Sequence, residues 1–368
     1  MSFRPTEFIP PDFTRADLVD APDAVLAAAP ADGVAPENYH ATTIFPEYFK
    51  IFGQWHLARE SRMDCVAVYE QGKIAVREFR NLKKGDMVVL GRTEDASDGI
   101  FVYTDGFRGA QNSPDETFAF RQGRSRETAF SRDYDNIYEL LDYEREHGYV
   151  VWVLGPACAF DSNSRDALSA LIQGGYVDAL LAGNALATHD LEGAYKKTAL
   201  GQNIYTQQIQ KNGHYNHIDT INRVRMYGSI PEFVRQENIS DGIIYSCVKK
   251  GVPFVLAGSI RDDGPLPEVY GNAYEAQDAM RGHIRKATTV ICMATVLHSI
   301  ATGNMTPSFR VLPDGTIRPV YFYTVDISEF ALNKLGDRGS YSAKSIVTNI
   351  QDFIVNVSKG VRYAKIKE

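Results

Sequence analysis

The chain has 368 residues, of which 44% are hydrophobic and 23% charged, a balance typical of an ordinary soluble globular protein of about two domains. Its net charge of -7 argues against a nucleic-acid surface and fits an enzyme that acts on a small molecule. Because no apolar run reaches the roughly 18 residues that span a bilayer and the N-terminus lacks the apolar core of a signal peptide, we expect a cytoplasmic protein without a membrane partner.

Residues 1–40 are rich in Pro, Ala and Asp and predict a loosely ordered arm with one short helix at DAVLAAA, residues 23–29. Residues 41–147 have a different character, because two β-rich runs flank Gln71-Gly72, which is a hairpin signal. We therefore expect a small β-rich α+β domain over residues 41–147, with an exposed polar loop at residues 110–135.

From about residue 148 short apolar runs alternate with helical patterns. The runs predict strands at residues 149–154, 177–183, 252–259, 288–294 and 319–326. The patterns between and after them predict helices at 164–173 (N-cap Ser162 or Ser164, stop at Gly174-Gly175), 216–228 (Ile218, Ile221 and Val224 on one face), 241–251, 274–287 and 343–357. This alternation predicts a mostly parallel sheet covered on both faces, an α/β Rossmann-like domain over residues 148–368.

Small and polar residues gather where these strands end, at the edge of a parallel sheet where ligands bind. Glycines there let backbone approach a ligand, the N-termini of the following helices suit phosphates, and an acidic strand end suits a ribose. The pattern favours a dinucleotide site without a Gly-x-Gly-x-x-Gly motif, although the same residues also punctuate ordinary turns. The strand-end residues are Gly155, Pro156, Asn184, Ala185, Gly258, Ser259, Thr295, His298 and Asp326.

One strand end carries three consecutive charged residues, Arg261, Asp262 and Asp263, in front of Gly264-Pro265. These side chains are either a structural ion pair or a site for a charged substrate. His189 and His298 are either half-buried structural histidines or site residues. His214 and His217 hint at a metal, but no third ligand has matching spacing, so we predict no metal site.

Four cysteines are far apart and form no Cys-x-x-Cys motif. We interpret Cys65, Cys247 and Cys292 as small buried hydrophobic residues. Cys158 follows a predicted strand in a loop, so it is a candidate to line the site.

Five motifs in order resemble the ornithine cyclodeaminases of archaea and cyanobacteria, a family related to lysine-ketoglutarate reductase/saccharopine dehydrogenase (LOR/SDH) proteins. They are GYVDALLAGNALATHDLE, NGHYNHIDTINRVRMYGSI, GVPFVLAGSIRDDGPLPEV, ATVLHSIATGNMTP and KLGDRGS followed by IVT. The resemblance runs from about residue 150 to 357, and residues 45–145 are more loosely similar to the β-rich N-terminal domain of the family. It implies a cofactor domain similar to deoxyhypusine synthase, which agrees with the missing Gly-x-Gly-x-x-Gly.

The resemblance implies NAD-dependent conversion of L-ornithine to L-proline and ammonia. Hydride leaves the α-carbon to give an imine, the δ-amine attacks that carbon, ammonia departs, and hydride returns to the cyclic imine. Arg261 would hold the α-carboxylate, while Asp262 and Asp263 would be counter-ion and base. Lys334 is a further catalytic candidate. Asp337 and Arg338 are additional candidates for contacts with the substrate. The expected NAD contacts are the strand-end residues above together with Asp190, Asn304 and Met305.

Two stretches differ from the family pattern, CAFDSNS at residues 158–164 and AYKKTALGQNIYTQ at residues 194–207, so the substrate is less securely implied than the cofactor. The alternatives are a cyclodeaminase for another diamino acid, an opine- or saccharopine-type oxidoreductase, and a non-catalytic NAD-binding subunit. The guanidine-hydrolysing domain of cyanobacterial relatives is missing from this sequence, so arginine hydrolysis is not implied. We expect an amino-acid substrate and a homo-oligomer.

Overall fold

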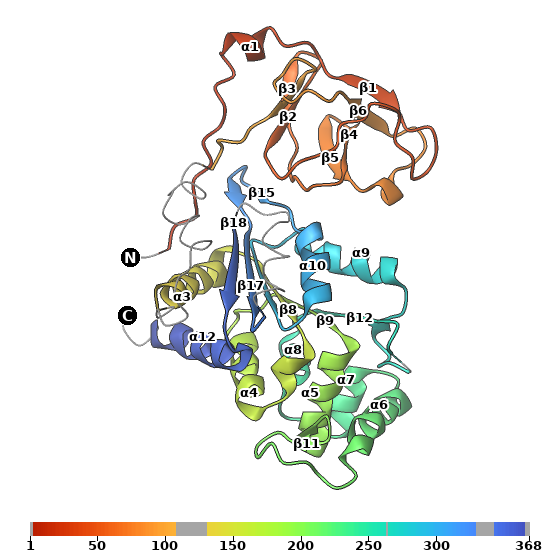
Figure 1. Cartoon of the computed structure of the whole chain (residues 1–368), viewed down its shortest axis with the longest axis vertical. Coiled ribbons are helices and arrows are strands. Elements are labelled where there is room, and N and C mark those ends of the chain that lie inside the picture. Colours follow the sequence, from red (N-terminus) through yellow and green to blue (C-terminus); the bar gives the residue numbers. More distant parts are fainter. Residues whose placement is uncertain (1–2, 108–130, 263, 329–341, 365–368) are drawn as a thin grey trace.

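The computed structural model describes residues 3–107, 131–262, 264–328 and 342–364, and Figure 1 shows a β-rich part beside a larger α/β part. Among the described residues no helix is both long and apolar enough to cross a membrane.

The β-rich part contains two antiparallel sheets. One has the order β1 (Val25–Ala28), β6 (Met87–Leu90), β4 (Val66–Glu70), β5 (Lys73–Arg77), and the other the order β3 (Gln54–Leu57), β2 (Glu47–Ile51), β7 (Ile100–Val102). The hairpin at Gln71-Gly72 is confirmed, with both residues at positive φ as a tight two-residue turn requires. The helix predicted at residues 23–29 is wrong: Val25–Ala28 pairs with β6, and the only short helix before it in the described residues is α1 (Ala16–Val19).

The α/β part is built on a seven-stranded, fully parallel sheet, which confirms the predicted fold class. Its order is β13 (Val269–Tyr270), β12 (Phe254–Ala257), β9 (Ala179–Gly183), β8 (Val150–Leu154), β14 (Thr289–Met293), β17 (Tyr321–Asp326), β18 (Ser342–Val347). All five predicted strands are present. β18 was predicted as the first turn of a helix, but Ser342–Val347 pairs with β17 and the helix begins only at Ile350.

Helices cover both faces of this sheet. Val150, Trp152 and Leu154 of β8 lie in a core with residues of α3 (Ser131–His147), α4 (Ser162–Gln173), α5 (Asn184–Lys196), α8 (Ile243–Lys250) and α12 (Ile350–Ala364). Val151 and Val153 point to the opposite face and pack with α9 (Ala273–Ile284) and α10 (Val296–Met305). The alternation follows from the pleat of the strand, which sends successive side chains to opposite faces. α6 (Asn216–Tyr227) and α7 (Ile230–Gln236) follow α5, at the far end from the β-rich part (Figure 1).

Local details of two predicted helices and one predicted loop differ from expectation. Asp161, rather than Ser162 or Ser164, caps α4, because its carboxylate accepts the Ser164 N–H at 3.0 Å. On α6, Val224 is buried but Ile218 is exposed. The loop expected at residues 110–135 lies almost entirely outside the described residues, and α3 begins at Ser131.

The two parts of the chain are joined by polar and aromatic contacts. Glu78 of the β-rich part pairs with Arg281 of α9 at 2.7 Å. Between α10 and β17, the short strands β15 (Phe309–Val311) and β16 (Ile317–Pro319) extend toward the β-rich part, where Phe309 packs against Phe107.

Candidate functional site

The chain crosses itself closely at the carboxyl ends of β8 and β14. A Cβ on Gly155 would lie 1.9 Å from the carbonyl oxygen of Ala294, so only glycine fits there. Ala294 itself has φ +59°, a left-handed conformation that costs a non-glycine residue energy and is concentrated at functional sites. The contact carries the chain from β14 over the end of β8.

His298 occupies the space that this crossing opens. Its Nδ1 lies 3.2 Å from the Thr295 hydroxyl, and its ring covers Gly183 at the end of β9, where a Cβ would lie 2.9 Å from the His298 Cε1. β8 separates β14 from β9 in the sheet, so α10 reaches over one strand to bring His298 to the next.

A second group comes from the end of β12. The carboxylate of Asp262 accepts the backbone N–H of Ser259 at 2.7 Å, and its other oxygen lies 3.4 Å from the amide nitrogen of Asn184. The Asn184 carbonyl oxygen accepts the backbone N–H of Leu266 at 3.1 Å, which orients the amide. We call Asn184, Asp262 and His298 the corner. Arg261, next to it, is exposed.

The electrostatics of the corner favour a neutral imidazole. Burial lowers the pKa of His298, and the negative charge of Asp262 partly offsets this by raising it. The corner therefore combines a half-buried carboxylate with a histidine that is deprotonated near neutral pH, an arrangement able to bind a cation and to accept a proton.

The helix N-termini at this edge are not equivalent. Asp161 caps α4. Asn349 caps α12, because the side-chain oxygen of Asn349 accepts the N–H groups of Gln351 and Asp352. By contrast, α5 begins after Gly183 and α10 after Thr295 with no side-chain cap. Their first-turn N–H groups point toward the strand ends, as a phosphate site requires. This arrangement fits the pyrophosphate of a dinucleotide.

Most of the predicted strand-end residues lie at this edge, as expected. Ala185 follows Asn184 in the first turn of α5, and Pro156 opens the 3-10 helix η2 (Pro156–Ala159). Gly258 donates its N–H to Tyr270 at 2.9 Å. Asp326 ends β17, where its carboxylate accepts the Ser328 N–H. Asn304 does not lie at this edge, because it is exposed at the C-terminal end of α10, whose N-terminus faces the strand ends.

Three predicted site residues are used elsewhere. The carboxylate of buried Asp190 pairs with Arg165 at 2.8 Å and accepts the N–H groups of Ile243 and Ile244, so it fixes the start of α8 and is not available to a cofactor. Met305, the last residue of α10, is buried in the core on that face of the sheet. Cys158 is buried too, and burial raises its pKa to about 12, so it behaves as a small hydrophobic residue.

Asp263, Lys334, Asp337 and Arg338 lie outside the described residues. In the described ranges, no cluster of three His, Cys, Asp or Glu side chains could hold a metal ion. His189 pairs with buried Glu192 at 3.0 Å. Ala294 ends a predicted strand, but its left-handed backbone could not be predicted, since nothing in a sequence marks an alanine with that conformation.

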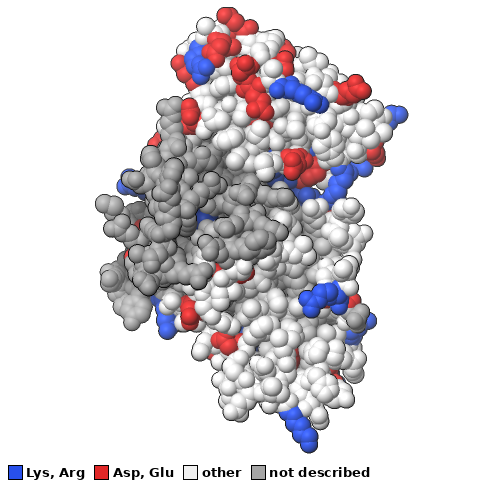
Figure 2. Space-filling model, in the orientation of Figure 1, with Lys and Arg blue, Asp and Glu red and all other residues white. Residues whose placement is uncertain are grey.

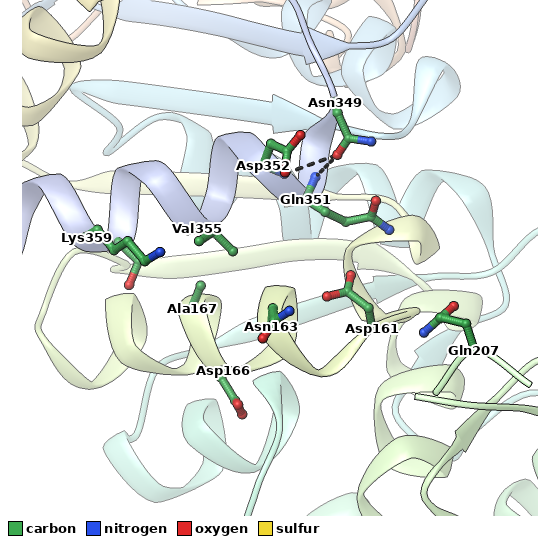
Figure 3. Close-up of a pocket in the computed structure, with 11 residues that line it drawn as sticks. Asp161, Asn163, Asp166, Ala167, Gln207, Asn349, Gln351, Asp352, Val355 and Lys359 are labelled. Carbon is green, nitrogen blue, oxygen red and sulfur yellow. Dashed lines mark hydrogen bonds between the residues drawn. The ribbon is translucent and has the colours of Figure 1, made fainter. Parts of the chain in front are cut away.

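A polar cavity of about 710 Å³ lies on the same side of the sheet as α4 and α12 and shares no lining residue with the corner (Figure 3). Asp161, Asp166 and Gln207 line it opposite Gln351, Asp352 and Lys359. Both helices that form it are capped by their own side chains, so it lacks the open N–H groups of α5 and α10 and is not the better phosphate site.

Comparisons with known proteins agree with this geometry. A family described as "Arginine dihydrolase ArgZ-like, C-terminal, Rossmann fold" matches residues 136–357. The chain is 37% identical to a Methanopyrus kandleri protein named ornithine cyclodeaminase, over 93% of this chain and 79% of the relative. A LOR/SDH protein structure from Methanococcus maripaludis superimposes with a TM-score of 0.82 at 34% identity, covering 94% of this chain and 99% of that one. The complex of AgrE with ornithine and NAD+ matches with a TM-score of 0.58 at 31% identity, covering 95% and 47%.

We predict that Gly183→Ala weakens NAD binding. The added methyl would meet the His298 ring at 2.9 Å, and overpacking of about 1–3 kcal/mol corresponds to a rise of roughly 5- to 150-fold in the dissociation constant. Isothermal titration calorimetry of wild type and of Gly183→Ala with NAD measures the two dissociation constants. Gly282→Ala is the matched control, since a methyl there meets nothing within 4 Å. Equal affinity of Gly183→Ala and wild type would contradict the site.

We predict that Asp262→Asn lowers the pKa of His298 further, because the variant removes the charge that opposes the effect of burial. A histidine pKa below its unfolded-state value means that native stability is retained above that value and lost as the pH falls through the folded-state pKa. The variant should therefore keep His298 neutral to lower pH than wild type does. NMR titration of His298 tests this, and an unchanged or raised pKa would place Asp262 too far away to matter.

Proposed function

Because this chain belongs to the ornithine cyclodeaminase family, we propose that it converts L-ornithine to L-proline and ammonia with NAD as cofactor. The observation that carries the proposal is the corner of Asn184, Asp262 and His298, which lies between the two uncapped helix N-termini. A single edge of the sheet thus offers groups for a dinucleotide and for an amino acid side by side.

The cofactor would be held by the first turns of α5 and α10, with Asn184, Ala185, Thr295 and His298 closest to it. Asp326 at the end of β17 would suit a ribose hydroxyl pair. When bound, NAD supplies the reversible acceptance of hydride from the α-carbon of the substrate.

The substrate carries one carboxylate and two ammonium groups, and the chain offers a partner of opposite charge for each kind. Exposed Arg261 would bind the α-carboxylate through its planar guanidinium. Asp262, held by the Ser259 N–H and the Asn184 amide, would bind an ammonium group. Asp263 and Lys334 remain our proposed further substrate contacts.

The reaction also needs a proton acceptor for the α-ammonium, since only the free amine yields an imine. His298 is suited to this step, because burial keeps its imidazole neutral and the Asp262 carboxylate would stabilise the imidazolium that forms. Thr295, close to His298 Nδ1, would orient the ring so that Nε2 accepts the proton.

Apolar side chains at the rim support a site that excludes water. Ile260 is fully exposed after β12, Leu297 is 70% exposed in the first turn of α10, and Ile327 is 70% exposed after β17. Each follows the end of a different strand. With substrate and cofactor in place, these side chains would cover the reacting atoms and protect the imine from hydrolysis.

We predict that the purified chain, given catalytic NAD+ and L-ornithine, forms proline and ammonia in equal amounts without accumulating NADH. Asp262→Asn should lower turnover on the order of 100-fold or more while NAD still binds, since the variant removes the charge that pairs with the substrate and assists His298. In the same reaction, proline is measured by chromatography, ammonia by an enzymatic assay and NADH by its absorbance.

Glu275→Gln is the control, because Glu275 is an exposed carboxylate on α9. Near-normal turnover of Asp262→Asn would contradict the role of the corner. NADH accumulating with ornithine would instead indicate an opine- or saccharopine-type oxidoreductase, and activity with a different diamino acid alone would indicate a cyclodeaminase of changed specificity.

A further inference from the structure

The polar cavity between α4 and α12 takes no part in the proposed reaction. Its volume of about 710 Å³ lies within the range of small-molecule sites, roughly 300–1,000 Å³. Figure 3 shows the two helices side by side along it, with Ala167 of α4 facing Val355 of α12. Polar side chains line the cavity on both sides of this apolar pair. Such a lining suits an elongated molecule with a charged group at each end.

One end of the cavity is rich in hydrogen-bond acceptors, and we call it the acceptor end. The side-chain nitrogen of Gln207 donates to the Phe160 carbonyl at 3.2 Å, and that of Gln351 donates to the Ala157 carbonyl at 3.5 Å. Because both amides use their nitrogens on the backbone, their carbonyl oxygens remain as acceptors. In Figure 3 the Gln351 side chain and the Asp161 carboxylate point toward one another. Two amide oxygens and a carboxylate together favour a cationic donor.

The other end of the cavity, formed by Ser358 and Lys359, offers donors, and we call it the donor end. Lys359 is exposed and has no ion-pair partner in the part of the chain that the structure describes. Ser358 lines the cavity although it is only 4% exposed, and within the described residues no group is hydrogen-bonded to its hydroxyl. A polar side chain buried to this degree normally has a partner, so the open hydroxyl points to a ligand. From Gln351 to Lys359 the α12 helix rises about 12 Å, which sets the distance between the two ends.

The charges of the lining decide the sign of the ligand. Among the described residues the cavity is lined by three carboxylates, those of Asp161, Asp166 and Asp352, and by one ammonium, that of Lys359. Side-chain caps occupy the N-termini of both helices, which disfavours a phosphate there. On the α/β part as drawn in Figure 2, the coloured acidic and basic side chains are few and scattered, so no larger surface field masks the charges of the cavity. The lining therefore favours a molecule with one anionic group and a net positive charge.

We propose that this cavity binds a basic amino acid, with its distal cation at the acceptor end and its α-carboxylate at the donor end. The carboxylate would pair with Lys359 and accept the Ser358 hydroxyl, and the aliphatic chain would lie between Ala167 and Val355. A guanidinium matches the acceptor end best, because it presents several N–H donors in one plane to Asp161 and the two glutamine oxygens. The site is separate from the corner, and the proposal does not depend on the catalysed reaction.

The first experiment is isothermal titration calorimetry of the full chain with L-arginine, without NAD or ornithine. Asp161→Asn should raise the dissociation constant about tenfold, because it removes the charge of the acceptor end while asparagine still caps α4. Lys359→Gln should raise it by about the same factor, because it removes the cation that pairs with the carboxylate. Asp166→Asn is the matched control and should change it less than about twofold, since Asp166 lies on the same helix but points away from α12 (Figure 3).

The second experiment assigns each charge of the ligand to one end of the cavity. L-Citrulline has a neutral distal group, so it should bind wild type about tenfold more weakly than L-arginine does. Agmatine keeps the guanidinium but has no carboxylate, so Lys359→Gln should bind it no more weakly than wild type does.

A wild type that does not bind millimolar L-arginine, or an Asp161→Asn variant that binds it as tightly as wild type, overturns the proposal. Asp262→Asn should retain wild-type affinity for L-arginine. If Asp262→Asn abolishes binding while Asp161→Asn and Lys359→Gln leave it unchanged, L-arginine occupies the corner and the cavity is not its site.

Discussion

The close contact between Gly155 and the backbone at Ala294 sets the geometry of the site. Without a side chain at residue 155, the chain that leaves β14 can pass directly over the end of β8. This crossing lets α10 place His298 over Gly183, two strands away from its own strand in the sheet. The left-handed backbone of Ala294 is the conformational cost of that approach.

The crossing explains how a dinucleotide site can exist without the usual fingerprint. In a Gly-x-Gly-x-x-Gly loop, one strand–turn–helix unit supplies the tight turn, the close approach and the open helix N-terminus. Here Gly155 allows the chain after β14 to cross the end of β8, while α5 and α10 present uncapped N-termini from two different strands. Side-chain caps on α4 and α12 distinguish these helices from the pair that would face the cofactor.

The central strands could be predicted from the sequence because strands buried on both faces are continuous apolar runs. The edge strand β18 was missed, since half-exposed residues such as Lys344 and Ser345 match a helix pattern as well as a strand. The strand at Val25–Ala28 was missed because alanine favours helices locally and only its pairing with β6 decides otherwise. Asp190 shows the same limit within the site, because its partner Arg165 is distant in sequence and the pairing exists only in the fold.

In this account one bound NAD serves both halves of the reaction at the corner of Asn184, Asp262 and His298. L-Ornithine carrying deuterium at the α-carbon tests it most directly, with catalytic NAD+ and mass spectrometry of the proline formed. We expect proline that keeps the deuterium at its α-carbon, because hydride leaves and returns to that atom without exchange. Proline without the label, with deuterium found in free cofactor or in water, would contradict the account.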